Sequence, residues 1–153
     1  MALYLIQHGR SLPKDLDPDQ GLSEEGIAET QRMADLAKNH GVRVSQIRHS
    51  AKTRARQTAE IFAKALSPQK GTLEVGGINP LDDVAEYATG VAADQNIMLV
   101  GHLPFMERMT SYLITGSVDK PVFKFQNSGI VCLDKDADRQ SWVILWSLMP
   151  KIG

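Results

Sequence analysis

The sequence predicts a single α/β domain over residues 1–153, with three α/β/α layers and a mixed, mostly parallel sheet that carries helices on both faces. Two observations lead to this prediction. Short apolar runs alternate along the chain with patterns of helical period. Two of these runs, residues 3–6 (LYLI) and 97–100 (IMLV), contain no polar residue, which is typical of central strands buried on both faces.

The first helix is predicted to begin after Ser23 and to end near Asn39. Serine is a favourable N-cap because its hydroxyl accepts a backbone N–H, and Glu24 and Glu25 place negative charge at the positive end of the helix dipole. A weaker strand is expected to follow over residues 44–48.

The second helix is predicted to follow Ser50 and to end before Pro68. It is the clearest helix of the chain, because apolar residues recur along it at helical spacing and form one stripe. The stripe consists of Ala55, Ala59, Phe62, Ala63 and Leu66.

Three further segments complete the pattern. A short helix is expected near residues 83–92, and another over residues 104–115, where proline suits the first helical position and Gly116 suits the end. The apolar runs 129–133 and 142–146 flank a polar stretch, and this arrangement predicts a hairpin.

Charge and composition exclude several classes of function. Seventeen basic residues against eighteen acidic ones give a net charge of -1, so no overall field attracts nucleic acid or anionic lipid. Cys132 is the only cysteine, and no disulfide can form within the chain. The apolar runs are too short to span a bilayer, and the first residues do not resemble a secretory signal. We therefore expect a cytoplasmic protein without nucleic-acid or membrane partners.

Two histidines occupy equivalent positions directly after the two central strands. His8 follows residues 3–6 and Gln7, and His102 follows residues 97–100 and Gly101. Ligands of open α/β sheets bind at the carboxyl ends of the strands, so this pair is a candidate site. A single histidine is more often structural, and His40 and His49, which follow no such strand, are interpreted in that way.

An anion site is predicted where the second helix begins. Arg54 lies one turn into this helix, and a helix N-terminus together with an arginine favours an anion. Lys52 and Arg56 lie off the apolar stripe and are interpreted as a solvated face. The sequence contains no Walker-type phosphate loop, dinucleotide-binding motif or HExxH zinc motif. Nothing in these motifs therefore suggests ATP, nicotinamide or zinc.

Four short motifs resemble those of the histidine phosphatase superfamily, whose fold is shared with the phosphoglycerate mutases. Residues 5–11 (LIQHGRS) resemble the Arg-His-Gly signature that opens the family, and residues 22–26 (LSEEG) resemble its helix start. Residues 50–58 (SAKTRARQT) and 100–104 (VGHLP) resemble its second arginine motif and its second histidine motif. The short chain and the form of the last motif, residues 101–105 (GHLPF), are most similar to the small phosphohistidine phosphatases of the SixA type. This resemblance implies no metal and no organic cofactor.

The resemblance implies a phosphoglycerate mutase-like fold and a role for each matching residue. His8 would attack phosphorus and become a phosphohistidine, which water then hydrolyses. His102 and Arg54 would hold the phosphoryl oxygens, where negative charge accumulates. Gly9 would let the backbone approach the phosphoryl group, and Ser11 would donate a hydrogen bond to it.

One residue departs from the family pattern. The family has arginine before the nucleophilic histidine, whereas this chain has Gln7, a neutral side chain that cannot form a bidentate pair with phosphate. Two interpretations of Arg10 are open. Either it joins Gln7 at the phosphoryl group and replaces the missing charge, or it faces solvent.

In larger members of the family a carboxylic acid protonates the leaving group, and the resemblance places this acid in about the segment after residues 79–80 (NP). Asp82 and Asp83 lie there, and either could protonate a leaving group, although adjacent acids before a helix are more often N-caps. Imidazole is a good leaving group, so a weak acid penalises phosphohistidine less than an alkyl phosphate.

The sequence therefore predicts a metal-independent phosphatase that acts on a phosphohistidine protein or on a small phosphomonoester. The alternative is a catalytically weakened member, with Gln7 in place of arginine, that binds phosphoryl groups or phosphoproteins as a regulatory module.

Overall fold

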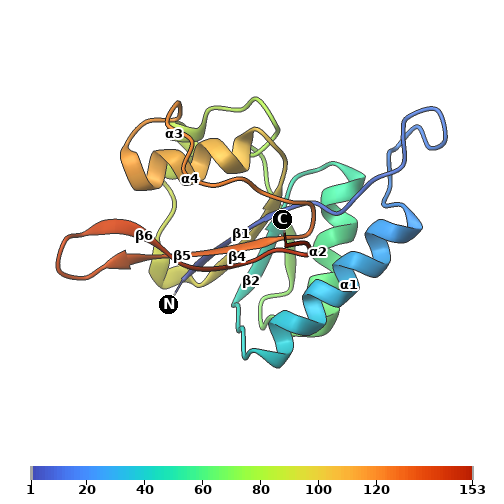
Figure 1. Ribbon diagram of the computed structural model, residues 1–153, viewed down its shortest axis with the longest axis horizontal. Coiled ribbons are helices and arrows are strands. Elements are labelled where there is room, and N and C mark those ends of the chain that lie inside the picture. The colour runs from blue at the N-terminus through green and yellow to red at the C-terminus, as the bar shows by residue number, and fades with distance from the viewer. Residues whose placement is uncertain (1, 153) are drawn as a thin grey trace.

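The computed structural model describes residues 2–152 as one six-stranded sheet with helices packed on it (Figure 1). In chain order the elements are β1 (Leu3–Gln7), α1 (Glu24–Asn39), β2 (Gln46–His49), α2 (Thr53–Leu66), β3 (Thr72–Glu74), α3 (Val84–Ala88), the 3₁₀ turn η1 (Ala93–Gln95), β4 (Ile97–Gly101), α4 (Phe105–Thr115), β5 (Ile130–Asp136) and β6 (Ser141–Leu148).

The strands follow the order β3-β2-β4-β1-β5-β6. The pairs β3/β2, β2/β4 and β4/β1 are parallel, whereas β1/β5 and β5/β6 are antiparallel. The predicted mixed, mostly parallel sheet is therefore confirmed. Parallel neighbours need crossover connections, and the helices that provide them cover the sheet.

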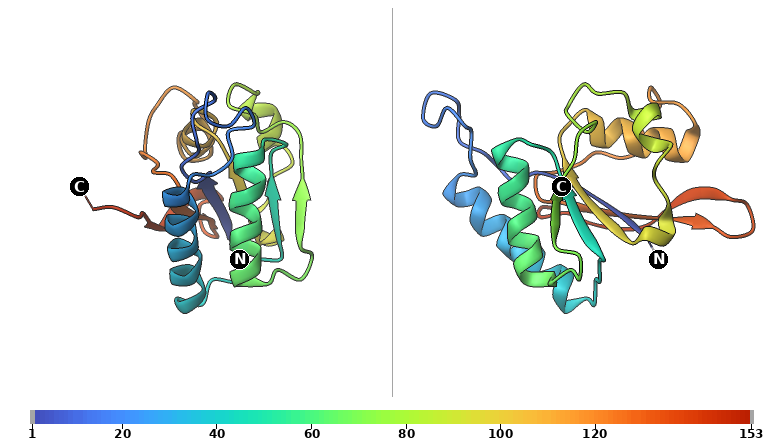
Figure 2. Two further views of the ribbon diagram at one scale, coloured as in Figure 1. Left: turned by 90° about the vertical axis from the view of Figure 1, so that its right-hand side faces the viewer. Right: turned by 180° about the vertical axis from the view of Figure 1, so that it is seen from behind.

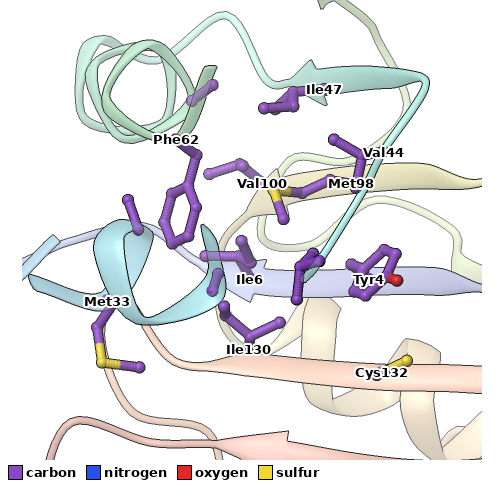
Figure 3. Packing of buried hydrophobic residues seen from close by; sticks show 14 of the residues in the cluster. Tyr4, Ile6, Met33, Val44, Ile47, Phe62, Met98, Val100, Ile130 and Cys132 are labelled. Atoms are coloured by element: carbon purple, nitrogen blue, oxygen red, sulfur yellow. The ribbon is translucent and has the colours of Figure 1, made fainter. Parts of the chain in front are cut away.

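Each face of the sheet has its own apolar core, and the three predicted layers are confirmed (Figure 2). Helices α1 and α2 cover one face, and Figure 3 shows Phe62 of α2 reaching toward Ile6 and Val100 of the sheet. Helices α3 and α4 cover the other face, where Phe105 packs with Leu5 and Leu99. Alternation along β1 explains the division, because Leu5 and Ile6 point to opposite faces.

The helix limits largely match the sequence pattern. Ser23 caps α1 by accepting from the backbone N–H of Gly26 at 3.0 Å, as predicted. Helix α4 begins after Pro104 and ends at Gly116, whose φ of 80° is left-handed. Helix α2 begins later than predicted, since Lys52 is still extended with ψ of 139°.

Further boundaries differ from the prediction, and β2 begins at Gln46 and ends at His49 rather than covering residues 44–48. The short strand β3 was not predicted, because its three residues are all exposed and show no apolar pattern. Helix α3 is shorter than residues 83–92, and its chain continues into η1. The hairpin strands are longer than predicted. Antiparallel pairing extends through polar residues such as Lys135, which faces Trp142.

Strands β1 and β4 bring His8 and His102, the residues that directly follow them, to one edge of the sheet. They are parallel neighbours in register, with Gln7 opposite Gly101, so the residues that follow both strands emerge together. Across residues 2–152, no helix has the length and apolar character needed to cross a membrane.

Candidate active site

His8 and His102 meet at the carboxyl edge of the two central strands. Their ring centroids lie 5.0 Å apart, and the backbone N–H of His8 donates to the carbonyl of Gly101 at 2.9 Å. Because each residue directly follows a buried strand, the position of each ring is set by the sheet rather than by a mobile loop. The structure thus brings together two residues that are 94 positions apart.

Arg54 joins the pair from the first turn of α2. Its Nε lies 3.3 Å from Nε2 of His8 and donates to it. Thr58, one turn further along, holds this arrangement in place. Its buried hydroxyl accepts from the N–H of Gly9 at 2.9 Å and donates to the carbonyl of Arg54 at 2.8 Å. One hydroxyl therefore joins the loop after β1 to the helix that carries the arginine.

The hydrogen bonds of His8 define its tautomer. Nδ1 donates its hydrogen to the carbonyl of Gly9 at 2.7 Å, and Nε2 accepts from Arg54, so the lone pair is on Nε2. Burial lowers the pKa of His8 from 6.5 to about 4, with a further contribution from the charge of Arg54. The imidazole is therefore neutral at neutral pH and carries a nucleophilic nitrogen.

His102 is more deeply enclosed, with 1% of its surface exposed. Its Nε2 lies 2.6 Å from Oγ of Ser50, and its buried Nδ1 forms no hydrogen bond within residues 2–152. Burial, followed by interactions with His8, Arg54 and Lys52, lowers the pKa of His102 to about 3. If Ser50 donates to Nε2, then Nδ1 carries the hydrogen and can donate it to an anion.

The start of α2 adds positive potential. This helix of 14 residues has no acidic residue in its first turn and no side-chain cap at its N-terminus. The positive end of its dipole is thus uncompensated beside Arg54, whose own pKa is lowered by burial. Neutral imidazoles, a guanidinium and a helix N-terminus form a site suited to an oxyanion.

Gln7, Gly9 and Ser11 occupy different surroundings. Gln7 is half-buried, and its buried Oε1 has no hydrogen-bond partner within residues 2–152. Gly9 is buried so tightly that a Cβ would lie 2.5 Å from Oγ1 of Thr30. Ser11 forms an isolated bridge with Leu22, and no hydrogen bond in the described chain joins its hydroxyl to the histidines.

Arg10 is held by acidic residues of α1. Its guanidinium lies 3.7 Å from Glu25 and 3.8 Å from Glu29. The Arg10 side chain is 42% exposed and makes these ion pairs with α1, which agrees better with the interpretation that it faces solvent. Its role at a phosphoryl group remains a prediction.

Asp82 closes the turn before α3, and Asp83 is the N-cap of that helix. Asp82 accepts from the N–H of Asn79 at 2.8 Å, and Asp83 caps α3 by accepting from the N–H of Glu86 at 3.1 Å. Both line a cavity of about 560 Å³ with Arg48 and no histidine. The predicted role of either aspartate as a general acid remains a prediction.

The structure also identifies site residues that the sequence did not suggest. Asn127 donates from Nδ2 to the carbonyl of His8 at 2.9 Å, and Ser50 contacts His102. Asn127 lies 119 positions after His8 in a segment without a motif, so no sequence signal marked it. Ser50 stood beside the predicted helix start. Cys132, the one cysteine, lies buried in β5, in agreement with the strand predicted for residues 129–133.

The described chain contains no group of three or more His, Cys, Asp or Glu side chains arranged as metal ligands.

Comparisons with known proteins agree with this arrangement. Residues 3–75, which include His8 and Arg54, match the model of the histidine phosphatase superfamily, branch 1. An uncharacterized protein of Picosynechococcus sp. is 28% identical over 91% of this chain and 88% of its own length.

Two solved structures are similar over nearly the whole chain. The protein histidine phosphatase SixA in complex with tungstate has a TM-score of 0.82 and 23% identity, covering 98% of this chain and 97% of that chain. At this identity the similarity concerns the fold. A protein of Agrobacterium tumefaciens, provisionally assigned as a phosphohistidine phosphatase SixA, has a TM-score of 0.75 and 28% identity, with 97% of each chain covered.

Proposed function

The chain belongs to the histidine phosphatase superfamily, and we propose that it hydrolyses phosphohistidine, or a small phosphomonoester, through a covalent intermediate on His8. The observation that carries the proposal is the state of His8. Its Nδ1 hydrogen is held by the carbonyl of Gly9, and its unprotonated Nε2 faces Arg54.

The first step transfers the phosphoryl group to the enzyme. The lone pair of His8 Nε2 forms a bond to phosphorus while the bond from phosphorus to the substrate nitrogen or oxygen breaks. The leaving group keeps that electron pair and takes a proton from water. Arg54 and the Nδ1 hydrogen of His102 donate to the phosphoryl oxygens, which carry increasing negative charge in the transition state.

The second step regenerates the enzyme. Water attacks phosphorus, the bond between phosphorus and Nε2 breaks, and inorganic phosphate leaves with the hydrogens of the water. His8 returns to its neutral form, which its pKa of about 4 favours at neutral pH. We propose that both steps proceed without a metal, because the imidazoles and the guanidinium supply the nucleophile and the oxyanion contacts.

Phosphohistidine is the substrate that this site suits best. Asp82 and Asp83 accept from the backbone N–H groups of Asn79 and Glu86, and neither forms a hydrogen bond with the two histidines within residues 2–152. A neutral or protonated imidazole leaves more readily than an alkoxide, which reduces the need for such an acid. A phosphorylated protein in the cytoplasm is accordingly the proposed partner.

One observation favours the alternative of a catalytically weakened, phosphoryl-binding module. Gln7 is neutral, and Arg10 is held by Glu25 and Glu29. A hydrogen bond to a charged group contributes about 1.5–3 kcal/mol, so a lost arginine contact lowers turnover by roughly 10- to 150-fold unless another cation compensates.

Hydrolysis of a phosphohistidine peptide and of p-nitrophenyl phosphate, without added metal, tests the proposal. We expect wild type to act on both, faster on the peptide, and His8→Ala to be inactive. His40→Ala is the matched control, because His40 is exposed at the end of α1. Equal rates for wild type and His8→Ala would exclude catalysis through His8, and tungstate binding without turnover would favour the binding module.

A further inference from the structure

A phosphoryl group presents more negative charge than the site residues described above can balance. Phosphate esters carry about −1.5 to −2 charges at neutral pH. His8 and His102 are neutral there, because burial lowers their pKa values to about 4 and about 3. Arg54 therefore supplies the one fixed positive charge in hydrogen-bond contact with the histidines within the described chain.

Of the remaining cations near the site, Arg10 and Arg56 are already paired. Arg10 lies between Glu25 and Glu29, and Arg56 forms an ion pair with Glu60 at 2.9 Å. Each would have to lose a carboxylate partner before it could bind a phosphoryl oxygen.

Lys52 differs from both arginines. It is exposed, and within residues 2–152 its ammonium forms no ion pair and no hydrogen bond. The backbone of Lys52 is nevertheless fixed at the site. Its N–H approaches Oγ of Ser50 at 3.4 Å, and its carbonyl accepts from the first turn of α2 at 3.1 Å.

The connection from Lys52 to the histidines runs through Ser50. The hydroxyl that faces the N–H of Lys52 is the one that contacts Nε2 of His102 at 2.6 Å. Lysine carries a compact charge on a flexible four-carbon stem, so a fixed backbone here still allows the ammonium to reach an oxyanion bound beside His102. Its charge already acts on His102, whose pKa it helps to lower.

We propose that Lys52 is a phosphoryl-binding residue, and that its ammonium supplies the second positive charge that the neutral Gln7 does not provide. This replaces the interpretation of Lys52 as part of a solvated face. The inference rests on the proposed function for its substrate class. It also makes a claim that can be measured without turnover, namely that an oxyanion at this site is held by Lys52.

Two independent features of the site support this assignment. The start of α2 carries no acidic residue and no side-chain cap, so nothing there neutralises the ammonium or the helix dipole. The buried Nδ1 of His102, without a hydrogen-bond partner in residues 2–152, provides a donor for the same anion. Lys52 and Arg54 would then contact the phosphoryl oxygens from the start of α2, and His102 would contact them from the end of β4.

Tungstate binding, measured by calorimetry, tests the assignment directly. We expect Lys52→Gln to weaken binding about tenfold, a value near the lower limit for a charged hydrogen bond because the side chain is exposed. Lys52→Arg should retain most of the affinity, since it keeps the charge. Lys64→Gln is the matched control, because Lys64 is an exposed lysine in the last turn of the same helix.

Two further readouts separate a charge effect from a structural one. The tungstate affinity of wild type should fall more steeply with salt than that of Lys52→Gln, because salt screens one more cation in wild type than in the variant. NMR titration should show a higher pKa for His102 in Lys52→Gln, since the charges of His8, Arg54 and Lys52 act on that ring and one is removed. Lys52→Met provides a second neutral variant if Lys52→Gln does not fold.

The outcomes distinguish this inference from the proposed function. If wild type hydrolyses phosphohistidine and both neutral variants bind tungstate as wild type does, the role of Lys52 is excluded and the function stands. If tungstate binding depends on Lys52 but wild type hydrolyses neither substrate, Lys52 is confirmed as an anion-binding residue and the function fails. A wild type that does not bind tungstate overturns the assignment of Lys52 as well.

Discussion

His102 is deeply buried, and only one of its two ring nitrogens is hydrogen-bonded. Nε2 contacts Ser50, whereas Nδ1 has no hydrogen-bond partner within residues 2–152. In the unfolded chain a histidine takes up a proton near pH 6.5, whereas His102 does so only near pH 3. Between these values the unfolded state binds more protons than the native state. The contribution of neutral His102 to the free energy of unfolding is therefore fully present above about pH 6.5, and it is lost progressively as the pH falls toward 3.

The first prediction concerns this pH dependence. Replacing His102 with Asn should make the free energy of unfolding less sensitive to pH between 6.5 and 4, because the depressed group is removed. One pKa unit corresponds to about 1.4 kcal/mol. Over this pH range, the free energy of unfolding of wild type should therefore change by a few kcal/mol more than that of the variant. Urea unfolding at several pH values measures it, and parallel curves for wild type and variant would contradict it.

The second prediction concerns the hydroxyl of Thr58, which joins Gly9 to Arg54. Thr58→Val keeps the shape but leaves the N–H of Gly9 without its acceptor, which costs about 1–3 kcal/mol. We expect a lower melting temperature and a fall in kcat larger than the change in KM. Thr58→Ser, which keeps the hydroxyl, should restore most of both. Equal kcat values for Thr58→Val and wild type would show that this bridge does not position His8 and Arg54 for turnover.

Sequence and structure agree best for residues whose position a strand or helix fixes. His8, His102 and Arg54 follow directly from the ends of apolar runs or a helix start, and the structure brings these three side chains together. The partner of Arg10 could not be predicted, since it depends on how α1 lies against the loop after β1. The contact between Asn127 and His8 required the complete fold.

At the scale of elements, the start of α1 packs directly on the loop after β1, which carries His8. Ser23 donates from its backbone N–H to the carbonyl of Arg10 at 3.0 Å, and the Cα of Gly26 lies against the same carbonyl. The glycine of the LSEEG motif is therefore explained by close approach of two backbones.

The third prediction tests this approach. Alanine favours a helix over glycine by about 1 kcal/mol, so Gly26→Ala would stabilise an isolated α1. In the protein its Cβ would overlap the carbonyl of Arg10, and we expect net destabilisation with lower activity. Gly76→Ala is the control, because no atom lies within 4 Å of its Cβ position. Thermal unfolding of both variants measures the effect, and a gain in stability for Gly26→Ala would contradict the packing described.

Element boundaries were predicted well where capping and burial act together. Ser23 and Gly116 marked the helix ends correctly because each satisfies a specific backbone requirement. Strand β3 is an edge strand whose residues are all exposed, so no apolar pattern distinguishes it from a loop. The extension of the hairpin depends on pairing between β5 and β6, which local composition does not encode.

For the molecule as a whole, stability depends on two cores separated by one sheet. Phe62 is fully buried between α2 and the sheet, whereas Leu81 is 78% exposed. The fourth prediction is that Phe62→Ala lowers the free energy of unfolding by about 3–5 kcal/mol, and that Leu81→Ala changes it by about 0.5 kcal/mol or less. Chemical denaturation measures both. A small effect at Phe62 would mean that the core can close around the cavity.

The central place of β1 has a consequence for how the protein is made. This first strand pairs with β4 and β5, which are synthesised about 90 and 130 residues later. Pairing over such separations is slow, because a long loop must close before any contact forms. His8 is therefore synthesised long before its two partners, because Asn127, which donates to its carbonyl, and His102, which lies beside its ring, come much later in the chain. A nascent chain that ends before β5 would lack a strand beside β1, so the surroundings of His8 are complete only after β5 has been synthesised.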